Sequence, residues 1–281
     1  MRKVLQLLAK PFIGTGIGQR FPLLHSLYQK VYATGAQQTD TFELPYNLQL
    51  TAVTSDCGPG LYFVSTATFE PFETQVFAAL VKTGDTIIDI GAHVGYYSLI
   101  GARLTGKQGQ VVAFEASPAN AKLLKKNRSA NKLKNITVEE QAVADSNGTV
   151  TFYINNSSSG DNSLVASENT KAVTVQAVKL DTYCNQKKLK PNIIKIDVEG
   201  AENQVLAGMQ HVLKQPQLRA LFVEITLPAN AQRSSAVATL QKAGFSIKLL
   251  DEHAGTIVPY SPAKLLELNN RYGFINILAQ K

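Results

Sequence analysis

Short apolar runs alternate with amphipathic segments over most of the chain after residue 84. The segments between the runs carry apolar residues at helical spacing, which predicts helices. Strands that alternate with helices of this length indicate βαβ units and a mostly parallel sheet. The predicted strands are TIIDI (86–90), QVVAFEA (110–116), ITVEE (136–140), NIIKID (192–197), ALFVEI (220–225), FSIKLL (245–250) and FINILAQ (274–280). The predicted helices cover 71–81, 96–104, 118–131, 200–213 and 232–243.

The strand runs are apolar throughout, as expected when both faces of a sheet are covered by helices. The pattern therefore predicts a doubly wound, Rossmann-like α/β fold. Residues 148–178 break the alternation, because GTVTFYI and AVTVQAV predict two strands on either side of the polar loop NNSSSGDNSL. We expect a small β insertion there, near the carboxyl edge of the sheet, where substrate-binding elements are common.

The N-terminal part, residues 1–68, predicts a separate helical and β lead segment before a main domain over 69–281. Apolar residues between Leu23 and Tyr32 recur at helical spacing, and Cys57–Gly60 reads as a turn between short strands. We expect the helix to pack onto the core. A cover over the substrate cleft and a contact in a homo-oligomer are the alternatives.

Composition narrows the class of partner and the compartment. The formal net charge is +7, from 28 basic and 21 acidic residues, but no dense basic run contains interleaved aromatics, so no nucleic-acid partner is expected. The two cysteines form no metal-binding pattern and fit a reducing compartment. The apolar stretch VLQLLA is short for a signal peptide, and no run approaches the roughly 20 residues of a membrane span. These features predict a cytoplasmic protein with no transmembrane segment.

Two strand ends carry residues suited to a nucleoside ligand, which in open α/β sheets binds outside the carboxyl ends of the strands. Asp89 precedes the glycine turn Gly91–Gly95, whose G-x-x-x-G spacing is not the dinucleotide fingerprint G-x-G-x-x-G. An acid before the turn suits an ammonium group better than a phosphate. Glu115 ends the next strand and can accept both hydroxyls of a ribose. A simple tight turn and a helix-capping carboxylate are the structural alternatives.

A third strand end carries the acidic sequence KIDVEGAE. Asp197 ends a buried strand and is expected to face the cleft, where it could orient a substrate or take a hydroxyl proton. Glu199 and Glu202 open the following helix, where stabilisation of the helix N-terminus is an equal alternative. The three acids could offer oxygen atoms to Mg²⁺, but no further ligand set is visible in the sequence, so no metal is expected.

Several of these motifs, in this order, resemble the FkbM family of methyltransferases over roughly residues 69–250. The likeness rests on FEPFET, GDTIIDIGAHVGYYSL, VVAFEASPAN, QAVAD, the GDNSL loop, VKLDTY, IIKIDVEGAENQVLAGM and LFVEI. The resemblance implies a class I methyltransferase sheet that uses S-adenosyl-L-methionine. The cofactor-binding residues that it implies are Asp89, Gly91, Ala92 and Gly95 at the methionine end, Glu115 at the ribose, Ala142 and Val143 at the adenine, and Asp197 near the methyl group.

The resemblance also implies methylation of a hydroxyl on a saccharide or small natural product. The N/D-P-P-Y/F motif of many N-methyltransferases is absent, and DVEG stands in its place. The candidate catalytic bases are Asp197 and Glu199, with His93 as a further candidate because imidazole titrates near neutral pH. Three alternatives remain: a nicotinamide-dependent oxidoreductase, a non-catalytic nucleoside-binding module, and a nucleic-acid methyltransferase favoured only by the positive charge.

Overall fold

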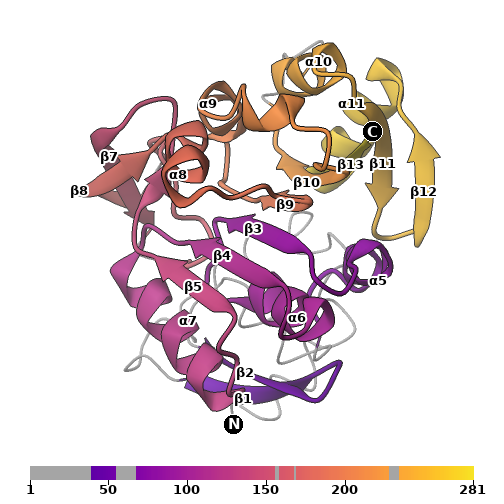
Figure 1. Cartoon of the computed structure of the whole chain (residues 1–281). Coiled ribbons are helices and arrows are strands. Elements are labelled where there is room, and N and C mark those ends of the chain that lie inside the picture. The colour runs from indigo at the N-terminus through magenta and orange to yellow at the C-terminus, as the bar shows by residue number, and fades with distance from the viewer. Residues whose placement is uncertain (1–38, 55–67, 156–157, 168, 228–233) are drawn as a thin grey trace, which may run out of the picture.

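The structure is a computed structural model that describes residues 39–54, 68–155, 158–167, 169–227 and 234–281 (Figure 1). It is an α/β fold built on one eight-stranded sheet, accompanied by a two-stranded and a three-stranded sheet. This architecture confirms the predicted doubly wound class. The helix predicted between Leu23 and Tyr32 and the turn at Cys57–Gly60 lie outside the described residues.

The large sheet has the order β12-β11-β13-β10-β9-β3-β4-β5. Its parallel part consists of β5 (Ile136–Glu139), β4 (Gln110–Phe114), β3 (Thr86–Ile90), β9 (Ile193–Ile196) and β10 (Ala220–Ile225). Antiparallel pairing then adds β13 (Ile275–Gln280), β11 (Ser246–Asp251) and β12 (Thr256–Pro259). From β3 the chain first builds outward through β4 and β5, and later continues on the other side through β9 and β10. The topological switch point, where such sheets bind ligands, therefore lies between β3 and β9.

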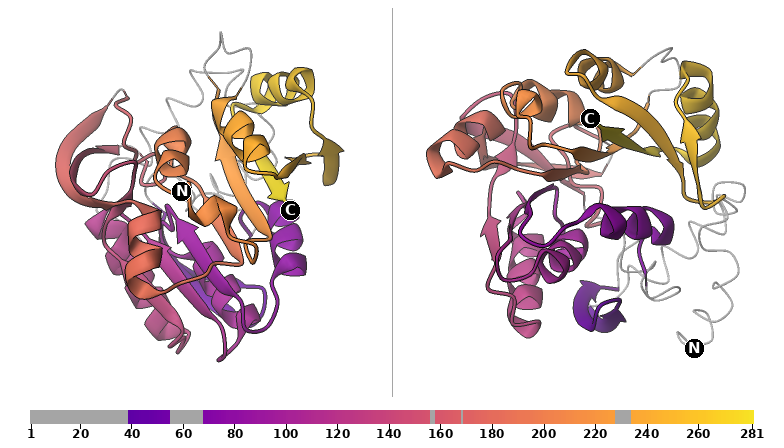
Figure 2. Two further views of the ribbon diagram at one scale, coloured as in Figure 1. Left: turned by 45° about the horizontal axis from the view of Figure 1, so that its top comes forward. Right: turned by 45° about the vertical axis from the view of Figure 1, so that its right-hand side comes forward.

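Alternate residues of each central strand point to opposite faces of the sheet. Ile87 of β3 belongs to one buried cluster and Ile88 to the other, and Val111 and Val112 of β4 divide in the same way. Each face is covered by its own helices (Figures 1 and 2). One face carries α5 (Pro71–Leu80), α6 (Tyr96–Thr105) and α7 (Pro118–Ala130). The other carries α8 (Leu180–Lys187), α9 (Glu202–Ala207), α10 (Ser235–Lys242) and α11 (Pro262–Tyr272).

The single helix predicted over 200–213 is wrong in extent. The structure has α9 over Glu202–Ala207 and then a separate 3₁₀ turn over Val212–Lys214. The break follows from Gly208, where a Cβ atom would lie 2.0 Å from the carbonyl oxygen of Ala144. The backbone at Gly208 therefore packs directly on the strand end that leads into the insertion, and only glycine allows this approach.

The insertion forms the predicted strands as a sheet of its own. β7 (Gly148–Asn155) pairs antiparallel with β8 (Thr170–Val178), and β8 also pairs in parallel with the short β6 (Ala142–Val143), which was not predicted as a separate strand. The loop between β7 and β8 turns back, because Ser163 exchanges two backbone hydrogen bonds with Tyr153, of 2.7 and 3.1 Å.

The hairpin of β1 (Thr39–Leu44) and β2 (Leu48–Val53) is fixed to the main body by one buried side chain of α7. The Asn127 amide nitrogen donates to the carbonyl oxygens of Thr51 (2.9 Å) and Val94 (2.8 Å), and its oxygen accepts the Thr51 N–H (2.8 Å). The division of the chain into 1–68 and 69–281 remains a prediction. Within the described ranges no helix combines the length and hydropathy of a membrane span.

Replacing Asn127 by alanine should lower the free energy of unfolding by about 2–4 kcal/mol, because three buried backbone groups lose their partners at once. The measurement is urea unfolding, with Lys126→Ala as the matched control on the exposed side of the same helix. The control should stay within about 0.5 kcal/mol of the native chain. Equal transition midpoints for the two variants would contradict the role given to Asn127.

Candidate functional site

The turn after β3 contacts the ends of the two strands on either side of it, β4 and β9. Gly91 and Gly95 both have positive φ angles, of 80° and 97°. The N–H groups of Gly91 and Ala92 both donate to the carbonyl of Phe114, at 3.0 and 2.9 Å. A Cβ atom on Gly91 would lie 1.7 Å from the carbonyl oxygen of Asp197. Glycine at this position is therefore what allows the end of β9 to lie against the turn.

The buried side chain of Asp89, in β3 just before the turn, contacts the helix that follows the turn. Ser98 of α6 donates its hydroxyl to Asp89 Oδ2 at 2.5 Å. Burial raises the pKa of Asp89 to about 6, although the Ser98 hydrogen bond and the nearby Lys195 oppose the shift. Asp89 thus connects the end of β3 to the first turn of α6.

Glu115, directly after β4, presents a buried carboxylate to the same region. Its Oε2 accepts the N–H of His93 and its Oε1 accepts the N–H of Ser117, each at 2.8 Å. Burial raises the pKa of Glu115 to about 7, and the two backbone hydrogen bonds together with a side-chain hydrogen bond to Asn120 oppose that shift. A carboxylate has about four acceptor positions, so Glu115 can still accept a hydroxyl group of a ligand.

His93 lies beside this carboxylate. Its backbone has a φ of 49°, in the left-handed region, and its Nε2 lies 3.1 Å from the hydroxyl oxygen of Ser159 in the insertion loop. Glu115 therefore holds the backbone of His93, and the imidazole contacts the insertion loop.

These elements enclose one cleft at the carboxyl ends of β3, β4 and β9, with β6 and the insertion loop as its outer wall. Of the residues predicted from sequence, Gly91, His93, Glu115, Ala142, Val143 and Asp197 line it. Its lining does not include Asp89, Ala92, Gly95 or Glu199. Asp89 lies within β3, and Ala92 and Gly95 belong to the turn behind the cleft. The other lining residues are Ile90, Phe114, Ala116, Asn120, Gln141, Phe152, Ser159, Gly160, Asn162, Ser163, Leu164 and Val198.

The turn between β9 and α9 holds the predicted acids. The N–H of Asp197 continues the pairing with β3 by donating to Ile90 O at 2.9 Å. Glu199 has a φ of 51° and lies in the turn, so the expectation that it opens the helix is wrong. Its carbonyl accepts the Ser163 hydroxyl at 2.7 Å. Glu202 does open the helix, and its Oε1 accepts the N–H of Gly200 at 2.7 Å, which closes the turn.

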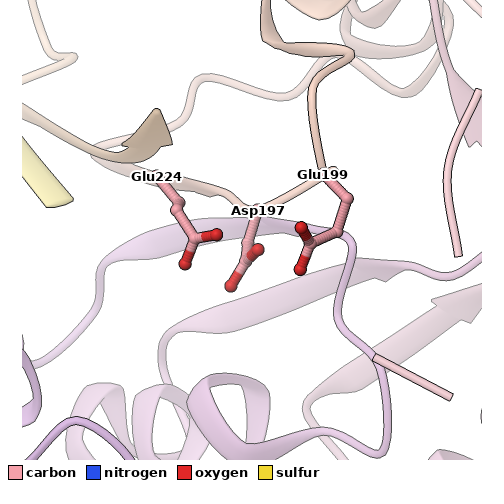
Figure 3. Close-up of side chains that lie close together, drawn as sticks. All are labelled: Asp197, Glu199 and Glu224. Atoms are coloured by element: carbon pink, nitrogen blue, oxygen red, sulfur yellow. The ribbon is translucent and has the colours of Figure 1, made fainter. Parts of the chain in front are cut away.

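Glu224 of β10 joins Asp197 and Glu199 in one group of carboxylates. One oxygen from each lies within 4.8 Å of the others, and all three side chains point to the same side (Figure 3). Burial and the neighbouring acids raise the pKa of Glu199 to about 8 and that of Glu224 well above its ordinary value. Sequence reasoning missed Glu224. The available signal was a lone charge at the carboxyl end of the otherwise apolar run ALFVEI.

An ion pair inside the core lies next to this group. Lys195 Nζ is 2.8 Å from Glu73 Oε1 of α5 and 3.7 Å from Asp197 Oδ2, and the side chains of Lys195 and Glu73 are 1% and 0% exposed. Burial alone would lower the pKa of Lys195, but the surrounding carboxylates raise it well above its ordinary value. Lys195 therefore stays charged inside the protein.

Glu70, just before α5, is a further buried acid near Glu73, and it contacts Asn276 of β13. Its Oε1 accepts the amide of Asn276 at 2.5 Å, and its Oε2 accepts the hydroxyl of Tyr97 at 3.0 Å. Burial, reinforced by the charge of Glu73, raises the pKa of Glu70 to about 8. A neutral, protonated Glu70 adds no negative charge to this group of buried residues near neutral pH.

Comparison with solved structures defines the class of protein. A SAM-dependent methyltransferase from Agrobacterium tumefaciens superimposes with a TM-score of 0.50, at 11% identity, over 88% of this chain and 71% of that one. The chain thus has the class I methyltransferase fold. The methyltransferase FkbM domain matches residues 89–254, more than half of the sequence. The chain belongs to the FkbM methyltransferase family.

Two curated relatives are similar to parts of the chain. The hexuronic acid methyltransferase AglP of Haloferax volcanii is 24% identical over 166 residues, which is 59% of this chain and 65% of that protein. Protein-L-isoaspartate O-methyltransferase 1 of Archaeoglobus fulgidus is 34% identical over 58 residues, 21% of this chain and 27% of that one. The chain therefore spans less than two thirds of the length of either relative.

Substituting Gly91 by alanine should be far more damaging than the same change at Gly84. Both residues have positive φ, of 80° and 87°, but a Cβ on Gly84 meets nothing within 4 Å. We expect Gly84→Ala to lower the free energy of unfolding by about 1–2 kcal/mol, the cost of the left-handed conformation alone. Gly91→Ala adds the clash with Asp197 and should cost at least about 3 kcal/mol more than the control. Urea unfolding measures both, and similar losses would refute the close approach.

Proposed function

We propose that this chain transfers the methyl group of S-adenosylmethionine to a hydroxyl of a saccharide or small natural product. The observation that carries the proposal is the placement of Glu115 and Asp197 on two sides of one cleft, with the glycine turn between them. Family membership supplies the reaction class, and the cleft supplies a place for the two substrates.

The residues around the cleft suit the parts of the cofactor. The Glu115 carboxylate keeps acceptor capacity for a ribose hydroxyl beside its bonds within the protein. Ala142, Val143 and Phe152 offer an apolar surface for a purine ring. The turn at Gly91 exposes backbone to the methionine end, where the acidic Asp197 favours an ammonium group. Asp89 lies behind the turn and is bonded to Ser98.

S-adenosylmethionine supplies a methyl group that is already activated by the sulfonium, so the protein chiefly aligns donor and acceptor. Asp197 lines the cleft and Glu199 is its neighbour, and these two carboxylates are the proposed acceptors of the hydroxyl proton. His93 is bonded to Glu115 and Ser159, which favours a role beside the ribose over that of the base.

Two features support a saccharide acceptor. The Haloferax volcanii relative is a hexuronic acid methyltransferase by name. The outer wall of the cleft carries the polar side chains of Ser159, Asn162 and Ser163. Hydroxyl and amide groups of this kind can bind a polyhydroxylated acceptor.

Changing Glu115 to glutamine should weaken the binding of S-adenosylmethionine and S-adenosylhomocysteine roughly tenfold to hundredfold, because hydrogen bonds to a charged acceptor are worth about 1.5–3 kcal/mol. Isothermal titration calorimetry measures this, with Glu267→Gln on the exposed face of α11 as the control. NAD is titrated in parallel, since an acid after the second strand also suits a dinucleotide ribose. Binding of NAD in place of the sulfur nucleosides would favour an oxidoreductase. Release of S-adenosylhomocysteine with hexuronic acids as acceptors then tests the transfer.

The affinity for S-adenosylhomocysteine should fall as the pH drops from 8 to 6. The pKa of Glu115 is raised to about 7, so its carboxylate predominates above that value and is progressively protonated below it. The neutral acid is the weaker acceptor, and the loss should approach tenfold. The same titration on Glu115→Gln isolates this group from the amine of the ligand. Identical pH profiles for the native chain and the variant would exclude Glu115 as the source.

A further inference from the structure

Three carboxylates from different parts of the chain meet beside the cleft. Asp197 directly follows β9, Glu199 lies two residues later in the turn, and Glu224 is near the end of β10 (Figure 3). One oxygen of each lies within 4.8 Å of the other two. Oxygen ligands at about 2.0–2.6 Å from one ion are separated by at most about 4–5 Å, so a single ion can contact all three.

Glu224 provides a separate observation that points to a ligand. Its side chain is buried, at 8% exposure, and projects into the group (Figure 3). Among the described residues, it forms no hydrogen bond and no ion pair. The other buried acids nearby have partners: Glu70 bonds to Asn276, and Glu73 pairs with Lys195. A buried carboxylate without a partner is costly, which makes Glu224 a group that a bound cation would satisfy.

The basic groups of the described chain do not satisfy the cluster. Lys195 is the one basic residue there that forms an ion pair with a member of it, at 3.7 Å from Asp197, and its shorter contact of 2.8 Å is to Glu73. Glu199 and Glu224 have no such partner. Among the described residues, a basic group therefore pairs with only one of the three oxygen ligands that converge here.

We propose that Asp197, Glu199 and Glu224 form a binding site for a hard divalent cation such as Mg²⁺, Mn²⁺ or Ca²⁺. Ligand sets made only of oxygen select these ions over Zn²⁺ or copper. Three protein oxygens leave coordination positions for water or for hydroxyl oxygens. Asp197 also lines the cleft, so an ion held by it would lie beside the cleft, and the proposed hydroxyl acceptor would bind partly through the ion. This last point rests on the proposed function, whereas the cation site does not.

The test measures cation binding to the full chain without cofactor or acceptor. Mg²⁺, Mn²⁺ and Ca²⁺ are titrated by calorimetry, and thermal unfolding is followed with and without each ion. Saturable binding by the native chain, with a rise in Tm, is the expected result. Glu224→Gln should weaken binding at least tenfold. Its Tm without the ion should be equal to or above that of the native chain, because the amide removes the unpartnered buried carboxylate.

The control variants distinguish cation binding at this site from nonspecific attraction of cations to acidic residues. Glu267→Gln removes an exposed acid in α11 and should leave cation binding unchanged. Glu199→Gln, in the turn, provides a second test if Glu224→Gln does not fold. No saturable binding up to about 10 mM, above the dissociation constants of weak protein Ca²⁺ sites, would overturn the proposal. Equal binding by Glu224→Gln and the native chain would do the same. S-adenosylhomocysteine binding by the same preparation reports on the proposed function independently.

Discussion

The ion pair between Lys195 and Glu73 joins β9, at the centre of the large sheet, to α5. Both side chains are almost entirely buried, so each gives up hydration and depends on the other for compensation. Breaking such a pair leaves an unpaired charge inside the protein, which typically costs about 3–5 kcal/mol. The position of α5 on the sheet and the charge state of the strand ends are therefore linked.

Around this pair, a polar layer replaces part of the apolar core on the side of α5 and α6. Strand register explains its position: Asp89 is paired with Lys195 across β3 and β9, and Glu224 is paired with Asn276 across β10 and β13. These residues fall at alternate positions from the isoleucines and valines that pack against the opposite helices. The layer ends at the surface with Asp197, which connects the buried charges to the cleft.

The parallel part of the sheet was predictable because each buried strand is a short apolar run bounded by turn residues. The residues at the strand ends were predictable for the same reason, since Gly91, Glu115 and Asp197 directly follow such runs. The extent of α9 was not, because apolar spacing continues through Met209 and Val212 and only the contact of Gly208 with Ala144 ends the helix. The pairing of Asn276 with Glu224 could not be predicted either, because it depends on the register between β10 and β13.

Two helices and one acid were missed for different reasons. α8 buries only Leu180, Tyr183 and Cys184, a stripe too short to stand out beside its polar residues. α11 was missed although it has the usual signals at both ends: the Ser261 side chain caps it through the Lys264 N–H, and a glycine of positive φ ends it. Glu224 was missed because the lone charge in ALFVEI does not by itself indicate the cluster partners, which lie elsewhere in the sequence.

The small sheet of β6, β7 and β8 bears on how such a protein can diversify. It carries the loop that forms the outer wall of the cleft, and that loop is fixed to the acidic turn through the Ser163 hydroxyl and to β7 through backbone pairing with Tyr153. Glu115, Gly91 and Asp197 instead stand on the large sheet. The loop can therefore change in sequence or length without altering the strands that carry Glu115, Gly91 and Asp197. The walls of the cleft are built on separate sheets, so a change in one does not require a change in the other.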